Sequence, residues 1–329
     1  MRRALQSSYQ AAQLDDRRIN STMSEEDNTK SDEIMQCAGC GVKEGDDIKL
    51  MKCTACYLVR YCGVKCQKEH RAKHKKECKK RAAELHDEIL FKQPECSYLG
   101  DCPICCLPLS FDPGQFGTMS CCAQTICAGC NLANQMRDLA NQMREGRRQQ
   151  TFPFCRHPMA RSEEEARLNN MKRVEANDPV AMTQIGVYYK RKGDDEKAFE
   201  YWSKAAKLGD MDAHHNLAMM YRDGDGVAKD KKKEVYHLEV ASIGGHAEAR
   251  HNLGNFEARN GRVDRAIKHH IIAANMGFHA SLEGLKKNYA IGIVSKEDLV
   301  SALRAHKAAV DATKSPQREE AIGKVTGGF

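Results

Sequence analysis

Apolar and small residues recur at helical spacing between residues 176 and 314. Ala181, Ile185 and Tyr189 stand four residues apart, which places them on one face of a helix. A second apolar stripe follows, and Gly209 stands where the glycine after a helix C-terminus is expected. This second stripe consists of Ala198, Trp202, Ala205 and Ala206. The pattern predicts a pair of amphipathic helices, and Asp178 before Pro179 is typical of the start of the first.

The same pattern returns further along the chain. Gly209, Gly245 and Gly277 lie 36 and then 32 residues apart, and each is followed by a similar helical stretch. A period of this length is typical of a helical solenoid. The longer spacing contains Asp223–Val227, which we interpret as an enlarged turn between two helices. An ordinary helical bundle with accidental internal similarity is the alternative.

The repeated positions resemble the Sel-one-like repeat family, a relative of the tetratricopeptide repeats, over roughly residues 177–291. The matching positions are Ala213, Leu217, Tyr221, Gly224, Gly226, Val227 and Asp230. The resemblance implies a solenoid that offers a surface to protein partners and carries no chemistry of its own. Ser295 is expected to begin a helix that caps the stack, with the remainder of 292–329 as a tail.

The first half of the chain differs from the second half in its cysteine content. The sequence has 329 residues and 16 cysteines, all between Cys37 and Cys155. No apolar stretch precedes Asp15, so we expect no signal peptide, a reducing cytoplasmic or nuclear location, and metal binding rather than disulfides. Residues 1–33 are polar and are expected to form a disordered tail. A mean hydropathy of −0.64 and short apolar runs argue against a membrane protein.

Eight potential zinc ligands lie within residues 37–78, in the domain that we assign to 34–93. They are Cys37, Cys40, Cys53, Cys56, Cys62, Cys66, His74 and Cys78. Zinc takes four nitrogen or sulfur ligands in structural sites, so eight ligands make two sites. Interleaved and sequential pairing are both compatible with the spacing, and His70 could replace His74 on the same helix face. Free buried thiols or a redox pair are the simpler alternative.

These eight positions, with Tyr61 and Gln67, resemble a MYND-type zinc finger. The resemblance implies interleaved sites and a partner peptide that contains proline. Its first site would be Cys37, Cys40, Cys62 and Cys66, and its second Cys53, Cys56, His74 and Cys78.

A basic helix is expected over residues 65–81, where nine basic residues meet only Glu69 and Glu77. Such a run invites a nucleic-acid hypothesis. No aromatic residue interleaves it as a stacking platform, so a solvated face that helps gather zinc-bound thiolates is the preferred interpretation. Nucleic acid is therefore not an expected partner, and an isolated 34–93 fragment should bind duplex DNA only weakly.

A second cysteine group lies over residues 96–158. It opens with Cys102-Pro-Ile-Cys105 and closes with Pro153-Phe-Cys155-Arg156, and these motifs resemble a degenerate RING-type finger. The resemblance implies a first site made by Cys102, Cys105, Cys127 and Cys130. The second site departs from the family, because Phe152 and Gln124 stand where ligands are usual. Its remaining candidate ligands are Cys121, Cys122, Cys155 and His157, of which we assign Cys122 and Cys155. A polar helix is expected over 131–150.

Ligases of this type hold a ubiquitin-conjugating enzyme in a reactive geometry. Ile104, Pro153 and Arg156 match the positions that the family uses for this contact. The simpler roles are packing for Ile104 and Pro153 and a surface charge for Arg156. A defective second site would leave the contact loop poorly held, which favours these simpler roles.

The sequence thus predicts a multidomain protein in which two small zinc-stabilised α+β cross-brace fingers precede an all-α repeat solenoid. The favoured function is a zinc-binding scaffold or adaptor that holds proteins or peptides through the MYND-like finger and the solenoid. A RING-type ubiquitin ligase whose repeats select the substrate is the alternative, with a conjugating enzyme as partner. A nuclear DNA-associated regulator, suggested by the net charge of +7, is a third hypothesis.

Overall fold

The computed structural model describes residues 36–145, 151–152 and 154–326. The chain forms two compact units, Met1–Lys92 and Gln93–Phe329. The expected tail over 1–33 and the predicted contact residue Pro153 lie outside the described residues. Among the helices that are described, none has both the length and the apolar character needed to cross a membrane.

The first unit contains a two-stranded antiparallel sheet and one long helix. Strand β1 (Met51–Lys52) pairs with β2 (Arg60–Tyr61), and α3 (Val64–Leu90) follows directly. The helix covers the basic run predicted over 65–81 and continues beyond it. The buried core consists of Cys37, Leu50, Cys53, Cys56 and Tyr61. A core made largely of cysteine is too small to stabilise a fold without bound metal.

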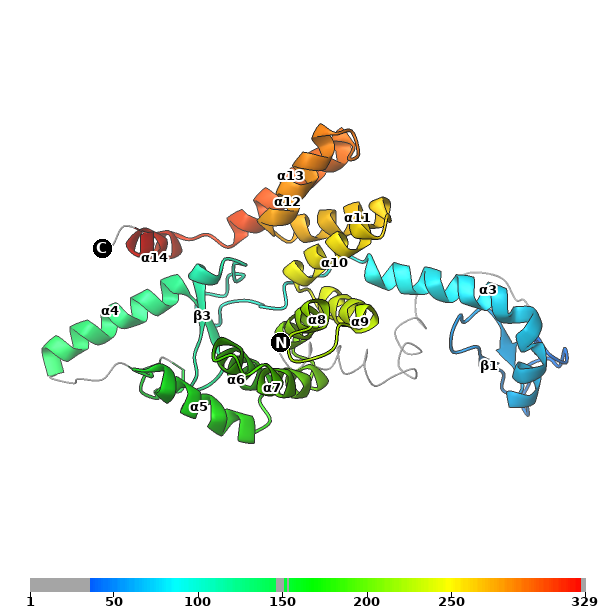
Figure 1. The fold of residues 1–329 in the computed structure, drawn as a ribbon, viewed down its shortest axis with the longest axis horizontal. Coiled ribbons are helices and arrows are strands. Elements are labelled where there is room, and N and C mark those ends of the chain that lie inside the picture. The colour runs from blue at the N-terminus through cyan, green and yellow to red at the C-terminus, as the bar shows by residue number, and fades with distance from the viewer. Residues whose placement is uncertain (1–35, 146–150, 153, 327–329) are drawn as a thin grey trace. The chain divides into compact units, whose positions relative to one another are not determined.

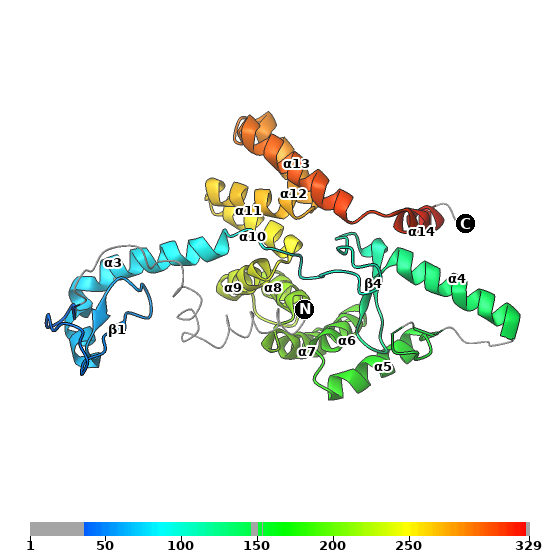
Figure 2. The same cartoon turned by 180° about the vertical axis from the view of Figure 1, so that it is seen from behind.

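The second unit begins with the second cysteine module, residues 96–158. Its elements are the 3-10 helix η1 (Pro113–Gln115), strand β3 (Phe116–Thr118), strand β4 (Thr125–Cys127) and helix α4 (Ala128–Glu145). The two strands pair antiparallel. The polar helix predicted over 131–150 therefore begins earlier, directly after Cys127, and residues 146–150 of that prediction lie outside the described residues. Figures 1 and 2 show α4 as one continuous helix. Leu109, Ile126 and Phe152 are buried together with three cysteines.

The solenoid consists of four helix pairs. They are α6 (Pro179–Arg191) with α7 (Asp195–Lys207), α8 (Met211–Asp223) with α9 (Lys231–Ile243), α10 (Ala247–Arg259) with α11 (Val263–Asn275), and α12 (His279–Ala290) with α13 (Lys296–Ala312). An aspartate side chain caps each of the first four helices by accepting backbone N–H groups. The expected start at Asp178 and Pro179 is thus confirmed.

One segment of the chain differs from the sequence interpretation. Residues 159–173 lie outside both the cysteine group of 96–158 and the helical pattern of 176–314, yet they include most of helix α5 (Glu163–Glu175), which packs on α6. The Ser162 side chain caps this helix by accepting from the backbone N–H of Glu165 at 3.1 Å. Three glutamates in its first turn suit the positive end of the helix dipole. The helix therefore extends the stack by one element at its N-terminal end.

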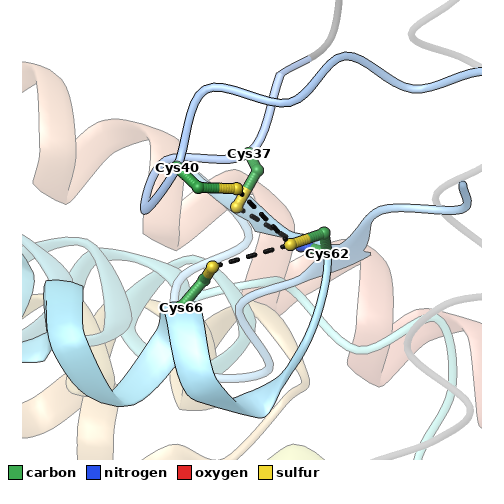
Figure 3. A group of neighbouring side chains, drawn as sticks. All are labelled: Cys37, Cys40, Cys62 and Cys66. Atoms are coloured by element: carbon green, nitrogen blue, oxygen red, sulfur yellow. Dashed lines mark hydrogen bonds between the residues drawn. The ribbon is translucent and has the colours of Figure 1, made fainter.

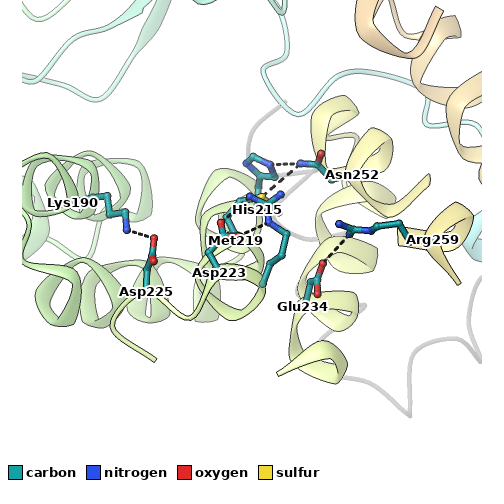
Figure 4. A network of polar contacts seen from close by, with 9 residues as sticks. Lys190, His215, Met219, Asp223, Asp225, Glu234, Asn252 and Arg259 are labelled. Atoms are coloured by element: carbon teal, nitrogen blue, oxygen red, sulfur yellow. Dashed lines mark hydrogen bonds and ion pairs between the residues drawn. The ribbon is translucent and has the colours of Figure 1, made fainter. Parts of the chain in front are cut away.

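Polar contacts join successive repeats (Figure 4). Lys190 Nζ on α6 lies 2.6 Å from Asp225 Oδ2 in the enlarged turn between α8 and α9. Asn252 Nδ2 on α10 lies 3.0 Å from His215 Nε2 on α8. Each contact crosses from one repeat to the next, so each stabilises the relative placement of neighbouring helix pairs.

The C-terminal tail predicted after the capping helix contains a further helix, α14 (Pro316–Thr326), which packs against α4. Arg318 is only 6% exposed there. Its guanidinium donates to the carbonyl oxygens of Pro108 at 2.6 Å and Leu107 at 3.0 Å. The backbone of α14 also approaches Gly129 so closely that a Cβ there would lie 2.9 Å from the Arg318 Cα. The end of the chain thus returns to the second cysteine module.

Candidate metal centres

Four cysteines of the first unit converge on one point (Figure 3). Cys37 and Cys40 come from the loop before β1, Cys62 directly follows β2, and Cys66 lies in the first turn of α3. The Cys40–Cys62 and Cys62–Cys66 sulfur–sulfur distances are both 3.6 Å. A tetrahedral zinc ion with Zn–S bonds of about 2.3 Å holds its sulfurs about 3.8 Å apart. The geometry therefore fits one zinc ion.

A second group in the same unit contains Cys53, Cys56, His74 and Cys78. The Cys53 and Cys78 sulfurs are 3.8 Å apart, and the Cys56 sulfur lies 3.1 Å from His74 Nε2. The two groups are interleaved along the chain, as the MYND resemblance implies. His70 lies outside both groups, and its Nδ1 is 3.1 Å from the Tyr61 hydroxyl.

The third group belongs to the second cysteine module and contains Cys102, Cys105, Cys127 and Cys130. The Cys105 and Cys127 sulfurs are 3.8 Å apart. Arg318 Nη2 donates to the Cys105 sulfur at 3.1 Å, across 213 residues of sequence. A hydrogen bond from a guanidinium stabilises a metal-bound thiolate. Sequence reasoning could not have found this partner, since nothing near Arg318 marks it as such.

The remaining candidate ligands form a smaller group of Cys121, Cys122 and Cys155. Cys121, which the sequence interpretation left unassigned, joins the assigned Cys122 and Cys155. His157, the other candidate, lies outside the group and places its Nδ1 3.0 Å from the carbonyl oxygen of Pro158. Cys96 and Cys106 belong to none of the four groups that the described residues form.

One backbone turn recurs at the first cysteine of three pairs. In each, the carbonyl oxygen of the first residue accepts from the amide of the fifth, which has a positive φ. The turns begin at Cys37, Cys53 and Cys102, and place the second ligand of the pair at the fourth position. The turn aims backbone N–H groups at the first sulfur, which favours the thiolate form.

The pKa values of these first cysteines follow from the turn. Burial raises the pKa of Cys37, but backbone N–H groups outweigh it and lower the pKa to about 6. The same balance lowers the pKa of Cys53 to about 7. The Cys127 thiol, and then backbone N–H groups, lower the pKa of Cys102 to about 4 against the effect of burial. The neighbouring Cys62 thiol raises the pKa of Cys66 to about 12, and burial raises that of Cys78 to about 12, so the first cysteine of each group is the one most readily present as a thiolate.

Two of the residues proposed to contact a conjugating enzyme, Ile104 and Arg156, lie at the surface of the second cysteine module. Ile104 is 42% exposed and stands between two ligands of the third group. Arg156 is also exposed and adopts a positive φ of 55°. Pro153 cannot be placed, because it is outside the described residues.

The solenoid also holds a segment of its own chain, residues 93–101, which forms neither helix nor strand and turns at Ser97–Gly100. The Tyr98 ring stacks on the His246 imidazole with centroids 4.3 Å apart, and its amide donates to the Gly245 carbonyl at 3.3 Å. The His246 Nε2 lies 3.2 Å from Asp212 Oδ1, and burial beside the Asp212 carboxylate raises the pKa of the Tyr98 phenol. The Cys96 carbonyl passes so close that a Cβ on Gly245 would lie 2.6 Å from it. The sequence interpretation had no signal for this contact.

Comparison with known proteins agrees with these observations. Residues 37–78 match the family model of the MYND finger, and residues 179–210 and 212–246 match that of the Sel1 repeat. The chain thus contains a zinc-binding MYND finger followed by Sel1 repeats, the family that we named Sel-one-like. Both modules generally mediate protein–protein interactions, so the chain is a protein-interaction adaptor in general terms.

Two solved structures resemble the chain over about half its length. A Sel1 repeat protein from Oxalobacter formigenes is 25% identical, with 47% of this chain and 68% of that chain covered and a TM-score of 0.41. The protective antigen c5321 of uropathogenic Escherichia coli, which displays an SLR fold, is 22% identical. That match covers 51% of this chain and 37% of the antigen, with a TM-score of 0.37. No curated protein matches the chain as a relative.

Proposed function

We propose that the chain is a zinc-dependent adaptor in which the MYND finger and the solenoid each hold a peptide of a partner protein. The observation that carries this proposal is the segment 93–101 on the solenoid. A stretch of chain outside the helices lies there with one aromatic side chain stacked and its backbone hydrogen-bonded. Stacking of this kind contributes about 0.5–1.5 kcal/mol beyond the buried area.

The finger supports the same function in a different way. Several apolar side chains of the first unit are exposed, although its core is small: Ile48, Met51, Leu58 and Val64. Exposed apolar side chains mark an interaction surface where they form one patch, and we propose that these four contribute to such a patch. They suit the proline-containing peptide that the MYND resemblance implies.

The peptide test uses the segment of the chain itself as the probe. A fluorescein-labelled peptide of residues 93–101, with serine in place of Cys96, is titrated with the full chain and followed by anisotropy. The wild-type surface is already covered by its own segment, so the peptide should bind weakly. The Tyr98→Ala chain loses the stack on His246 and the area that the phenol ring buries, so it should bind the peptide about tenfold more tightly.

Tyr236→Ala is the matched control, because this tyrosine is 51% exposed on α9 and distant in sequence from the segment. It should leave binding at the wild-type level. Adding His246→Ala to Tyr98→Ala should abolish the gain, because the stacking partner is then lost. If the peptide binds neither the wild-type nor the Tyr98→Ala chain, the solenoid is not a peptide-binding surface at this position.

A second candidate function is that of a RING-type ubiquitin ligase, which the exposed Ile104 beside a complete four-cysteine group favours. The purified chain would be mixed with ubiquitin, activating enzyme and a panel of conjugating enzymes. Ubiquitin chains that form with the wild type and vanish with Ile104→Ala would support the ligase. If no ubiquitin chains form with any conjugating enzyme, the ligase function is refuted and only the adaptor function remains.

A further inference from the structure

The recurring backbone turn marks two more positions in the second cysteine module. The Met119 carbonyl accepts from the Ala123 amide at 2.7 Å, and the Phe152 carbonyl accepts from the Arg156 amide at 2.8 Å. Ala123 and Arg156 have φ values of 54° and 55°. The fifth residues of the three cysteine turns also have positive φ values. These two turns therefore have the backbone geometry that positions zinc ligands elsewhere in the chain.

Both turns carry a cysteine at the fourth position but not at the first. Cys122 and Cys155 occupy the fourth positions, and Met119 and Phe152 occupy the first. Phe152 is fully buried in the core of the module, so its ring fills the place that a ligand takes in the other turns. Cys121, next to Cys122, adds a third thiol to the group.

The sulfur positions fit a metal ion rather than a disulfide. The Cys121 sulfur lies 3.4 Å from that of Cys155 and 3.9 Å from that of Cys122. A disulfide bond would bring two sulfurs to about 2.05 Å. The observed distances bracket the 3.6–3.8 Å found in the three complete groups.

The chain offers no fourth cysteine or histidine at this point. All 16 cysteines and all 13 histidines lie within the described residues, and none of the others joins the group. Cys155 is exposed, so the group faces solvent on one side. A zinc site with three protein ligands keeps its fourth position for water or an external ligand, unlike a closed structural site.

We propose that Cys121, Cys122 and Cys155 form a three-thiolate site for a thiophilic ion such as Zn²⁺, whose fourth position takes an exchangeable external ligand. This goes beyond the adaptor function, because the site binds a small thiol or a partner's side chain directly to the metal. The open position also makes this ion more exchangeable than those held by four ligands of the chain.

The first test counts zinc in the full chain, purified with a phosphine reductant that contains no thiol. We expect four ions per wild-type chain, one for each group, and three in Cys155→Ser. The matched control is Cys106→Ser, which removes an exposed thiol outside the groups and should keep four. Three ions in the wild type, with Cys121, Cys122 and Cys155 open to thiol reagents, would overturn the proposal.

The second test asks whether the fourth position is open. The Co²⁺-substituted chain should change its visible spectrum when β-mercaptoethanol is added, and a metal-chelating dye should remove one ion much faster than the other three. Phe152→Cys would supply the missing ligand, so the spectral change should disappear and the fast release should slow at least tenfold. His157→Ala should have no effect on either measurement.

The outcomes separate the alternatives. Loss of one ion in His157→Ala would show a closed site with histidine as the fourth ligand, and would refute an open position. An unchanged Co²⁺ spectrum with added thiol would refute it as well. Because Phe152 is buried, the Phe152→Cys chain could fail to fold. The zinc content of Cys155→Ser and the reactivity of the wild-type thiols then decide whether the three-thiolate site exists.

Discussion

A single methyl group placed on α6 tests how tightly the solenoid is packed. Gly186 faces the indole of Trp202 on α7, and a Cβ at this position would lie 2.4 Å from Trp202 Nε1 and 2.5 Å from Cδ1. Trp202 is only 4% exposed, and its Nε1 donates to the Thr183 carbonyl at 3.2 Å. Gly186→Ala therefore forces a buried side chain to move and weakens its hydrogen bond.

The expected magnitude is a balance of opposing effects. Alanine is favoured over glycine inside a helix by about 1 kcal/mol. Overpacking a close-packed core costs about 1–3 kcal/mol, and the weakened hydrogen bond adds about 1 kcal/mol. The free energy of unfolding should thus fall by about 1–3 kcal/mol.

Gly284→Ala on α12 is the matched control, because a Cβ there meets nothing within 4 Å. It should raise the free energy of unfolding by about 0.5–1 kcal/mol. Urea unfolding of the full zinc-loaded chain can be followed by the fluorescence of Trp202, the only tryptophan, so the signal reports on the solenoid alone. A Gly186→Ala chain as stable as Gly284→Ala would refute the close packing of α6 against α7.

Three further outcomes are expected. Removing zinc with a chelator should unfold residues 36–158 while the helices of 177–312 remain; equal loss of circular dichroism from both parts would contradict the view that only the fingers depend on metal. Arg318→Ala should speed zinc release from the group that contains Cys105, since it removes the hydrogen bond at 3.1 Å, whereas the exposed Arg304→Ala should not; equal release rates in both variants would argue against the role of α14. Acid should unfold the solenoid as the pH falls from about 6.5 toward 4, because burial lowers the pKa of four histidines and the unfolded chain takes up protons that the folded chain excludes. The pKa values are about 3 for His214 and His215 and about 4 for His237 and His270. Each such histidine lowers the free energy of unfolding by about 1.4 kcal/mol for every unit by which the pH falls in this window. A midpoint of thermal unfolding that stays constant from about pH 7 to 4.5 would contradict this expectation.

The repeated helices were predictable because their signal is local. Ile185 and Leu217, which mark equivalent positions of successive repeats, are both buried. The Cys-x2-Cys spacing is an equally local signal for the turns that begin at Cys37, Cys53 and Cys102, since a turn of five residues depends only on its own backbone. A capped helix over 163–175 had an equally local signal at Ser162 and Glu165, which we overlooked beside the polar composition of the segment.

The sequence by itself determined the periodic helices, the number of metal-ligating pairs and the zinc chemistry, because these depend on residues a few positions apart. Only the tertiary structure showed Arg318 against Cys105, Tyr98 stacked on His246, and Cys121 beside Cys155. Each of these contacts joins residues 34 to 213 positions apart. Their partners are chosen by how folded elements pack against one another, and no spacing along the chain encodes that choice.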